Sequence, residues 1–151
     1  MTHTATHIRR LFLEPKVTYA VPEAAEILAM PLDDVLGWME VGELEGVDTI
    51  EGVRLSWGEL ADFGMGFWSQ ETVEEALGAD LADAIPELLR LADLEVRLPR
   101  LEILALQRLA DRDGKSVDAV LARELLDVVS AHFDYLVTAI PGFATALRWP
   151  Q

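Results

Sequence analysis

The sequence of 151 residues contains no cysteine and only three histidines. The missing thiols exclude disulfide bonds, a cysteine nucleophile and zinc sites built on cysteine. No apolar run approaches the roughly 18–20 uncharged residues that a membrane-spanning helix needs, so we expect no membrane partner. The stretch from Met1 to Arg10 is too polar for a signal peptide, and we therefore predict a cytoplasmic protein.

Motifs of catalysis and cofactor binding are missing as well. The chain carries no G-x-S-x-G, no phosphate-binding loop and no Rossmann glycine pattern. No nucleophile is accompanied by a base and an orienting group, so we predict no enzyme, no catalytic residue and no cofactor. His3 and His7 have a spacing that can clamp a metal on a helix, but no third ligand accompanies them. We therefore predict no metal site and interpret residues 1–16 as a solvated leader.

Positive charge is scarce. Twelve basic residues stand against twenty-seven acidic ones, which gives a net charge of −15. Residues 1–63 carry −8, residues 64–93 carry −6 and residues 94–151 carry only −1. DNA is bound largely by neutralising its phosphates, so an acidic chain repels it on average. The position of the charge therefore matters more than its sum, and the last third is nearly balanced.

Residues 17–42 predict a short strand followed by two helices. Val17–Val21 favours an extended segment, and Pro22 suits the first turn of a helix that ends near Leu28. A second helix is predicted from about Leu32 to Val41 and ends at Gly42. Its predicted buried stripe consists of Val35, Trp38 and Met39.

Residues 47–63 predict a hairpin and a third helix. Two β-rich runs, 47–50 and 53–56, flank the dipeptide Glu51-Gly52, which favours a tight turn. Ser56 is suited to cap a short helix that runs to Phe63. We therefore take residues 1–63 as one small domain.

Residues 64–93 predict an acidic connector. The segment opens with the glycine-rich joint Gly64-Met65-Gly66, and Gly78 and Pro86 divide it into about two short helices. Its apolar residues are expected to pack on a neighbour. Its net charge of −6 makes it the natural surface for a basic partner.

The pattern changes at Leu94. The run Leu94–Leu98 alternates strictly between apolar and charged residues, which is typical of a strand with one buried face, and Pro99 ends it. Helical periodicity then covers residues 100–113, where Gly114 closes the helix. Ser116 is a good cap for a second helix that reaches about Val137, and a short tail follows from Phe143 to Trp149.

This C-terminal order resembles the ribbon-helix-helix family. The residues that carry the resemblance are LEVRLP at 94–99, RLEILALQRLADRD at 100–113 and GKSVDAVLARELLDVV at 114–129. A lone strand leaves its backbone groups unpaired, and pairing with the same strand of a second chain satisfies them. We therefore predict a homodimer through residues 94–151, with the interface formed by Leu94, Val96, Leu98, Leu121 and Leu125.

The resemblance implies a DNA contact on the outward side of the ribbon. Arg97 and Arg100 would face the DNA, and Lys115 with Ser116 would hold a phosphate at the start of the second helix. The outward Glu95 opposes this role because its carboxylate repels phosphates. A dimerisation core without any DNA contact is the alternative.

Residues 18–63 resemble excisionase-like members of the MerR-type winged helix-turn-helix group. The resemblance is carried by Tyr19–Ala25, by Gly42-Glu43-Leu44, by the hairpin end Val53–Ser56 and by Glu59-Leu60. Such proteins read DNA with the second helix. Here that helix contains no lysine or arginine, and Arg54 is the single base of the wing.

Three aromatic residues are candidate anchors for a protein partner: Trp68, Phe143 and Trp149. For the two in the tail, the alternative is that the tail folds back onto its own protein. Together these patterns predict a mainly α protein, with a small winged helix-turn-helix domain and a ribbon-helix-helix dimerisation domain.

The predicted function is that of a dimeric DNA-binding regulator, and fusions of this kind suit an antitoxin-like repressor that binds operator DNA and a basic partner such as a toxin. The alternative is a protein-interaction module on DNA-binding folds that has lost DNA binding.

Overall fold

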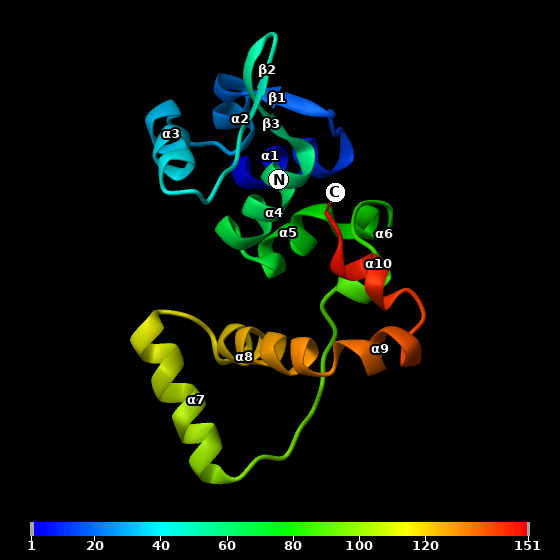
Figure 1. The fold of residues 1–151 in the computed structure, drawn as a ribbon. Coiled ribbons are helices and arrows are strands. Elements are labelled where there is room, and N and C mark those ends of the chain that lie inside the picture. Colours follow the sequence, from blue (N-terminus) through cyan, green and yellow to red (C-terminus); the bar gives the residue numbers. More distant parts are fainter. Residues whose placement is uncertain (1, 151) are drawn as a thin grey trace. The chain divides into compact units, whose positions relative to one another are not determined.

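Helices make up most of residues 2–150, the part of the chain that the computed structural model describes (Figure 1). The chain divides into two units. Unit 1 contains the chain up to Leu91 together with the stretch from Thr145, and unit 2 is Ala92–Ala144. Of the helices in the described chain, none has the length and apolar character needed to cross a membrane.

Unit 1 combines several helices with one small sheet. Its helices are α1 (His3–Leu13), α2 (Val21–Ile27), α3 (Leu32–Glu40), α4 (Trp57–Phe67), α5 (Gln70–Leu77) and α6 (Leu81–Ala84), with single 3-10 turns at Gly78–Asp80 and Glu87–Leu89. Its strands are β1 (Thr18–Ala20), β2 (Val47–Thr49) and β3 (Gly52–Ser56). The short strand, the two following helices, the hairpin and the third helix therefore occur in the expected order.

The sheet has the order β1-β3-β2 and is antiparallel throughout. Tyr19 of β1 lies opposite Leu55 of β3, and both side chains are fully buried. Gly52 at the hairpin turn has a φ of +103°, a conformation that a residue with a side chain adopts only with strain. The predicted hairpin is thus confirmed, and β1 completes it as a third strand.

The predicted helix boundaries in this region follow local chemistry. The Ser56 hydroxyl accepts a hydrogen bond of 3.2 Å from the backbone N–H of Glu59, as expected of a cap. Gly42 follows α3 with a φ of +83°, and its N–H donates to the carbonyl of Met39. The buried stripe of α3 is narrower than predicted. Val35 is fully buried and Met39 is half-buried, whereas Trp38 is 39% exposed.

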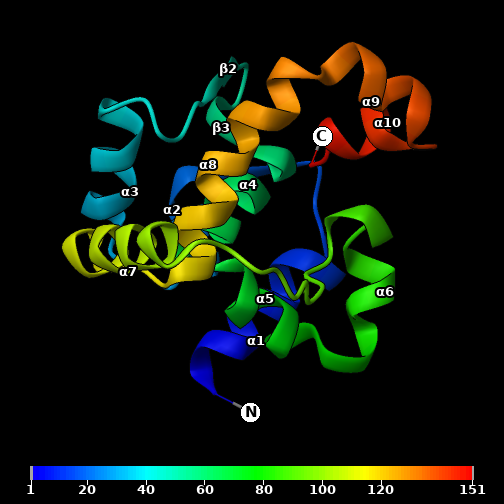
Figure 2. The same cartoon turned by 90° about the horizontal axis from the view of Figure 1, so that it is seen from below.

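Residues 2–16 are not a solvated leader. They contain α1, whose Ile8, Leu11 and Phe12 form one buried stripe. This helix packs on α4 and α5, and Figure 2 shows it beside α5. The Trp57 Nε1–H group donates a hydrogen bond of 2.9 Å to the carbonyl of Leu11. The spacing of these apolar residues is helical, so the signal was present in the sequence.

Residues 64–91 likewise belong to unit 1 and do not form a separate connector. The predicted glycine joint lies inside α4, where Gly64 is buried and leaves room for the Trp68 ring. Val73, Leu77 and Ile85 are among the most buried side chains of the core. A hydrophobic core recruits such residues whatever the charge of their neighbours, because burial removes their apolar surface from water.

Arg9 fixes the end of α5 against α1. Its guanidinium donates to the carbonyls of Ala76 and Leu77, at 3.1 and 3.0 Å, and forms an ion pair with Asp80. These carbonyls lie in the last turn of α5, where the helix itself supplies no donor. A single arginine thus joins the N-terminal helix to the segment that follows Gly64.

Unit 2 contains α7 (Arg100–Asp113), α8 (Val117–Ala131), α9 (Phe133–Ala139) and the start of α10 (Phe143–Leu147). The first of these helices begins and ends where the sequence predicts. Gly114 closes it with a φ of +64°, and the Ser116 hydroxyl accepts from the Ala119 N–H at 3.1 Å. Helix α8 is shorter than predicted because the helix is interrupted at His132, after which α9 begins.

The predicted strand at 94–98 is absent from the single chain. Residues 91–99 have no regular secondary structure, and Leu94 is 81% exposed. An isolated extended segment cannot form a strand because a strand is defined by hydrogen bonds to a neighbour. The predicted neighbour belongs to a second chain.

The burial of α1 generates the first prediction. Replacing Leu11 by alanine leaves a cavity in the core, so the free energy of unfolding is expected to fall by about 2–5 kcal/mol in urea denaturation. Thr4→Ala, on the exposed side of the same helix, is expected to change it by less than about 0.5 kcal/mol. An unchanged midpoint for the Leu11→Ala protein would mean that α1 is not part of the core.

Candidate dimer and nucleic-acid interface

Unit 2 leaves most of its apolar side chains exposed. Within residues 92–144 only Ala110 and Val120 are buried. The exposed large apolar residues of this unit are Leu94, Val96, Leu101, Ile103, Leu104, Leu125, Leu126, Val128, Phe133, Tyr135 and Ile140. Soluble proteins rarely leave so many large apolar side chains of one unit exposed unless some of them form an interface.

The predicted dimer residues belong to this apolar surface. Leu94, Val96 and Leu125 are exposed, whereas Leu98 and Leu121 are half-buried. Helices α7 and α8 contact each other and lie at a wide angle in Figure 1. Two helices in contact at a wide angle bury only a small patch. This explains why only Ala110 of α7 and Val120 of α8 are buried.

The basic residues of unit 1 upstream of Leu91 are all engaged. Arg9 pairs with Asp80, Arg10 with Glu26, Lys16 with Glu23, Arg54 with Glu51, and Arg90 donates to the carbonyls of Ile85 and Ala82. The hydrogen bond from Lys16 holds the pKa of the Glu23 carboxyl below its ordinary value. None of these cations is therefore free to meet a phosphate without first giving up a partner.

The free cations lie mainly in unit 2. Within residues 2–150, the side chains of Arg97, Arg100, Arg108 and Lys115 form no hydrogen bond or ion pair, and all four are exposed. Arg148 is similarly free in the tail. Three of these residues were predicted to contact DNA. Arg108 was not, because the sequence does not show which helix arginines will find a carboxylate.

The turn between α7 and α8 presents the predicted phosphate-binding residues. The Ser116 hydroxyl is occupied as the helix cap, so it orders the helix start while Lys115 extends freely. Asp113 lies just before this turn and receives hydrogen bonds from Arg112 at 2.8 Å and Arg123 at 3.3 Å. Arg112 first, and then Arg123, lower the pKa of the Asp113 carboxyl. The two guanidinium groups offset the negative charge that would otherwise oppose a phosphate here.

The region that resembles a DNA-reading domain offers little positive charge. Helix α3 has no lysine or arginine, and its exposed side chains are acidic or apolar. The Arg54 guanidinium donates to the Thr18 hydroxyl at 2.8 Å and lies 3.5 Å from the Glu51 carboxylate. The one base of the wing thus stabilises the sheet.

The aromatic residues predicted to anchor a partner lie against their own chain. Trp68 is half-buried and packs on the core of unit 1. The Trp149 ring stacks on Phe12, with centroids 6.4 Å apart, and meets Trp57 edge-on at 6.1 Å. Phe143 lies beside Phe133 in unit 2. For Trp149 the structure matches the alternative in which the tail folds back.

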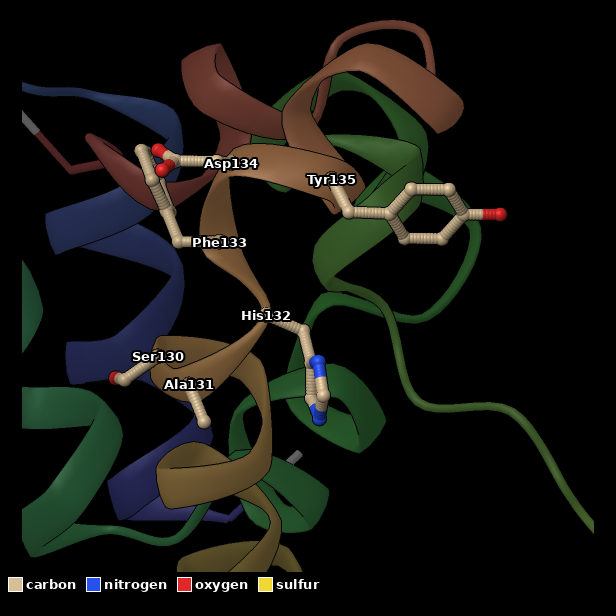
Figure 3. Close-up of a pocket in the computed structure, with 6 residues that line it drawn as sticks. All are labelled: Ser130, Ala131, His132, Phe133, Asp134 and Tyr135. Carbon is tan, nitrogen blue, oxygen red and sulfur yellow. The ribbon is translucent and has the colours of Figure 1, made fainter.

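The three histidines lie at two places in the described chain. A shallow hollow at the break between α8 and α9 is lined by Ser130–Tyr135, and in Figure 3 the His132 ring points away from the Asp134 carboxylate. On α1 the Nε2 atoms of His3 and His7 lie 3.0 Å apart. Among residues 2–150 no group of three or more metal-binding side chains comes together.

Comparisons with protein-family models, with characterised proteins and with solved structures gave no significant match for this chain.

The α7–α8 turn generates the second prediction. Replacing Arg112 by alanine is expected to raise the pKa of Asp113 toward its ordinary value, and Arg123→Ala to raise it less. The measurement is a carbon-13 NMR titration of the Asp113 carboxyl. Because the folded pKa is lowered, the stability that this carboxylate contributes is present above its unfolded-state pKa and is lost as the pH falls through the folded pKa.

Lys115→Ala is the control for this titration, because Lys115 forms no bond to Asp113 within the described chain. It should leave the titration unchanged. Equal shifts in the Lys115 and Arg112 variants would show that general charge, and not the hydrogen bond, sets the pKa.

Proposed function

We propose that the protein is a cytoplasmic, dimeric DNA-binding regulator, in which unit 2 supplies both the dimer interface and the DNA contact. The observation that carries this proposal is the location of the free cations. Arg97, Arg100, Arg108 and Lys115 are exposed without a partner among residues 2–150, whereas every base between Thr2 and Leu91 is engaged. DNA affinity depends on cations that are available to phosphates.

Dimerisation is supported by what one chain leaves unsatisfied. The run 94–98 alternates apolar and charged residues but has no strand partner in its own chain. A second copy of the run would pair its backbone and cover Leu94 and Val96. In such a ribbon-helix-helix dimer the exposed leucines of α7 and α8 would close a shared core, and each chain would compensate for the small core of the other.

The proposed DNA contact follows from the same alternation. If Leu94, Val96 and Leu98 face the shared core, Arg97 faces outward, where a two-stranded ribbon can enter the major groove. Lys115 would contact a phosphate at the start of α8, close to amide groups that a helix start leaves without partners. Glu95 also faces outward in this arrangement. Its carboxylate repels phosphates, which lowers the affinity, and it can pair only with a base edge that donates a hydrogen bond.

An antitoxin-like role is the more specific form of this proposal. Unit 1 is strongly acidic and has few free cations, which suits a surface that binds a basic protein and avoids DNA. A repressor of this kind would bind operator DNA through unit 2 and its toxin through unit 1. This role rests on charge and on analogy with known fusions.

A protein-interaction module without DNA binding is the second candidate. It is favoured by α3, the helix that would read DNA in a winged helix-turn-helix domain, because its exposed face is acidic and apolar. In this case unit 2 would serve only as a dimerisation domain.

The third prediction concerns the dimer. Sedimentation velocity at micromolar concentration is expected to give the mass of two chains, and Val96→Asp is expected to shift it to one chain because an unpaired carboxylate would be buried. Arg97→Asp introduces the same side chain at the neighbouring outward position and is expected to leave the dimer intact. A folded wild-type monomer at this concentration would contradict the ribbon.

The fourth prediction concerns DNA. Fluorescence anisotropy with the promoter of the protein's own operon is expected to show binding that weakens steeply with salt. Arg97→Ala should raise the Kd by roughly tenfold or more, and Lys115→Ala should weaken binding to all sequences and reduce the salt slope by about one.

The matched control is Arg148→Ala, which removes an equally free arginine outside unit 2. It is expected to change the Kd little. Binding no stronger than to random DNA, even at low salt, would rule out the regulator and leave the interaction module.

A further inference from the structure

A groove crosses the exposed side of α3 in unit 1. It is lined by Met30, Asp33, Asp34, Gly37, Trp38, Val41 and Phe67, and its volume is about 500 Å³. We call it the α3 groove. Five of these residues lie on α3 or directly after it, and Phe67 comes from the end of α4.

Helical spacing explains why these residues share one surface. Asp33, Gly37 and Val41 follow each other at intervals of four, and Asp34 and Trp38 form a second row beside them. Gly37 lines the groove and leaves open space there, because a Cβ atom added to it would meet nothing within 4 Å. The buried side of the helix is occupied by Val35, so this row faces away from the core.

The apolar walls of the groove are large and held in place. Val41 is 68% exposed, Phe67 49% and Trp38 39%. Phe63 contacts both aromatic walls, with its ring centroid 5.5 Å from that of Trp38 and 5.6 Å from that of Phe67. An exposed aromatic surface that is already ordered binds a partner with little loss of side-chain entropy.

The charged end of the groove is acidic and unpaired. Within residues 2–150, the side chains of Asp33 and Asp34 form no hydrogen bond or ion pair. Helix α3 contributes no cation, and the bases of α1, β3 and the segment before α2 are already paired. The carboxylates are therefore available to a cation from outside.

We propose that the α3 groove binds a basic amphipathic helix of a partner protein. Apolar side chains on one face of that helix would lie over Gly37, between Val41 and the rings of Trp38 and Phe67. Lysine or arginine side chains beside them would pair with Asp33 and Asp34, and an arginine can also stack on the indole ring. This inference deepens the role proposed for unit 1 in binding a basic partner, on which it rests, and it does not depend on DNA binding.

Charge favours this occupant over the others. DNA and anionic membrane surfaces would meet two unpaired carboxylates, which repel them. Unit 1 of a second copy would bring an acidic surface against the same carboxylates, because residues 1–63 carry −8 and residues 64–93 carry −6. A basic partner is attracted, and its association rate gains from the negative field around unit 1.

The probe for this proposal is a labelled 18-residue helical peptide with leucine at every third or fourth position and arginine between. Fluorescence anisotropy with the full-length protein is expected to show saturable binding. The same peptide with glutamate in place of arginine is expected to show none. Absence of binding by the arginine peptide would overturn the proposal.

Gly37→Leu tests the groove itself. The added side chain enters open space and leucine favours a helix over glycine, so the fold is expected to be retained or slightly stabilised. The leucine would fill this open space, and we expect the peptide Kd to rise at least tenfold. Unchanged binding would show that the peptide is held elsewhere.

Asp33→Asn with Asp34→Asn tests the charge. This double variant is expected to raise the peptide Kd at least fivefold and to reduce its salt dependence. Glu71→Gln with Asp83→Asn removes the same charge from exposed positions on α5 and α6 and is expected to change the Kd less than twofold. If both double variants weaken peptide binding equally, the overall negative charge of the protein explains the effect, and the proposal is overturned.

Two further measurements separate the groove from other roles. If Gly37→Leu abolishes self-association in sedimentation, the occupant is a second copy and the proposal is overturned. Promoter binding by Gly37→Leu is expected to equal that of the wild type. The groove proposal and the DNA-binding proposal can therefore fail independently. Gly37→Leu is expected to change peptide binding alone, and Arg97→Ala is expected to change DNA binding alone.

Discussion

Burial of α1 is the interaction on which unit 1 depends. The stripe of Ile8, Leu11 and Phe12 contacts helices from the middle of the chain, and the carbonyl of Leu11 accepts the indole hydrogen of Trp57. Arg9 extends the same contact to the end of α5. Without α1, the side chains of Val73 and Leu77 would lose part of their cover, and α5 would lose its main helix contact. One helix near the N-terminus thus organises a core that continues beyond Ile85.

Unit 2 shows the opposite balance in the same chain. Gly114 ends α7 and Ser116 caps the start of α8. Only Ala110 and Val120 are nevertheless buried within residues 92–144. Local signals determine where a helix starts and stops, but tertiary burial supplies most of its stability. A unit with complete helices and almost no core is what the proposed dimer would explain, because a second copy would supply the missing burial.

The sequence predicted the features that depend on nearby residues. The hairpin around Gly52, the cap at Ser56, the stop at Gly42 and the bounds of α7 all follow from chemistry within a few positions. The predicted leader (residues 1–16) and connector (residues 64–93) were misassigned because their burial depends on contacts between residues far apart in the sequence, above all those between α1 and α5. Trp38 was assigned to the core on helical spacing alone, although its ring lies on the flank of α3 against Phe63. The hydrogen bonds that occupy Arg54 were equally beyond the pattern, because Thr18 lies on another strand.

The stacking of Trp149 on Phe12 has a consequence for how the chain is assembled. The chain before Ala92 and the stretch from Thr145 both belong to unit 1, so unit 2 is an insertion attached to it at two points. A chain emerging from the ribosome would release residues 92–144 before Trp149 could reach Trp57. A single break in residues 92–99 would leave the two units joined through the other attachment. A partner that displaced Trp149 from Phe12 would release the C-terminal attachment of unit 2. Unit 2 would then be joined to unit 1 only through the linker at residues 92–99.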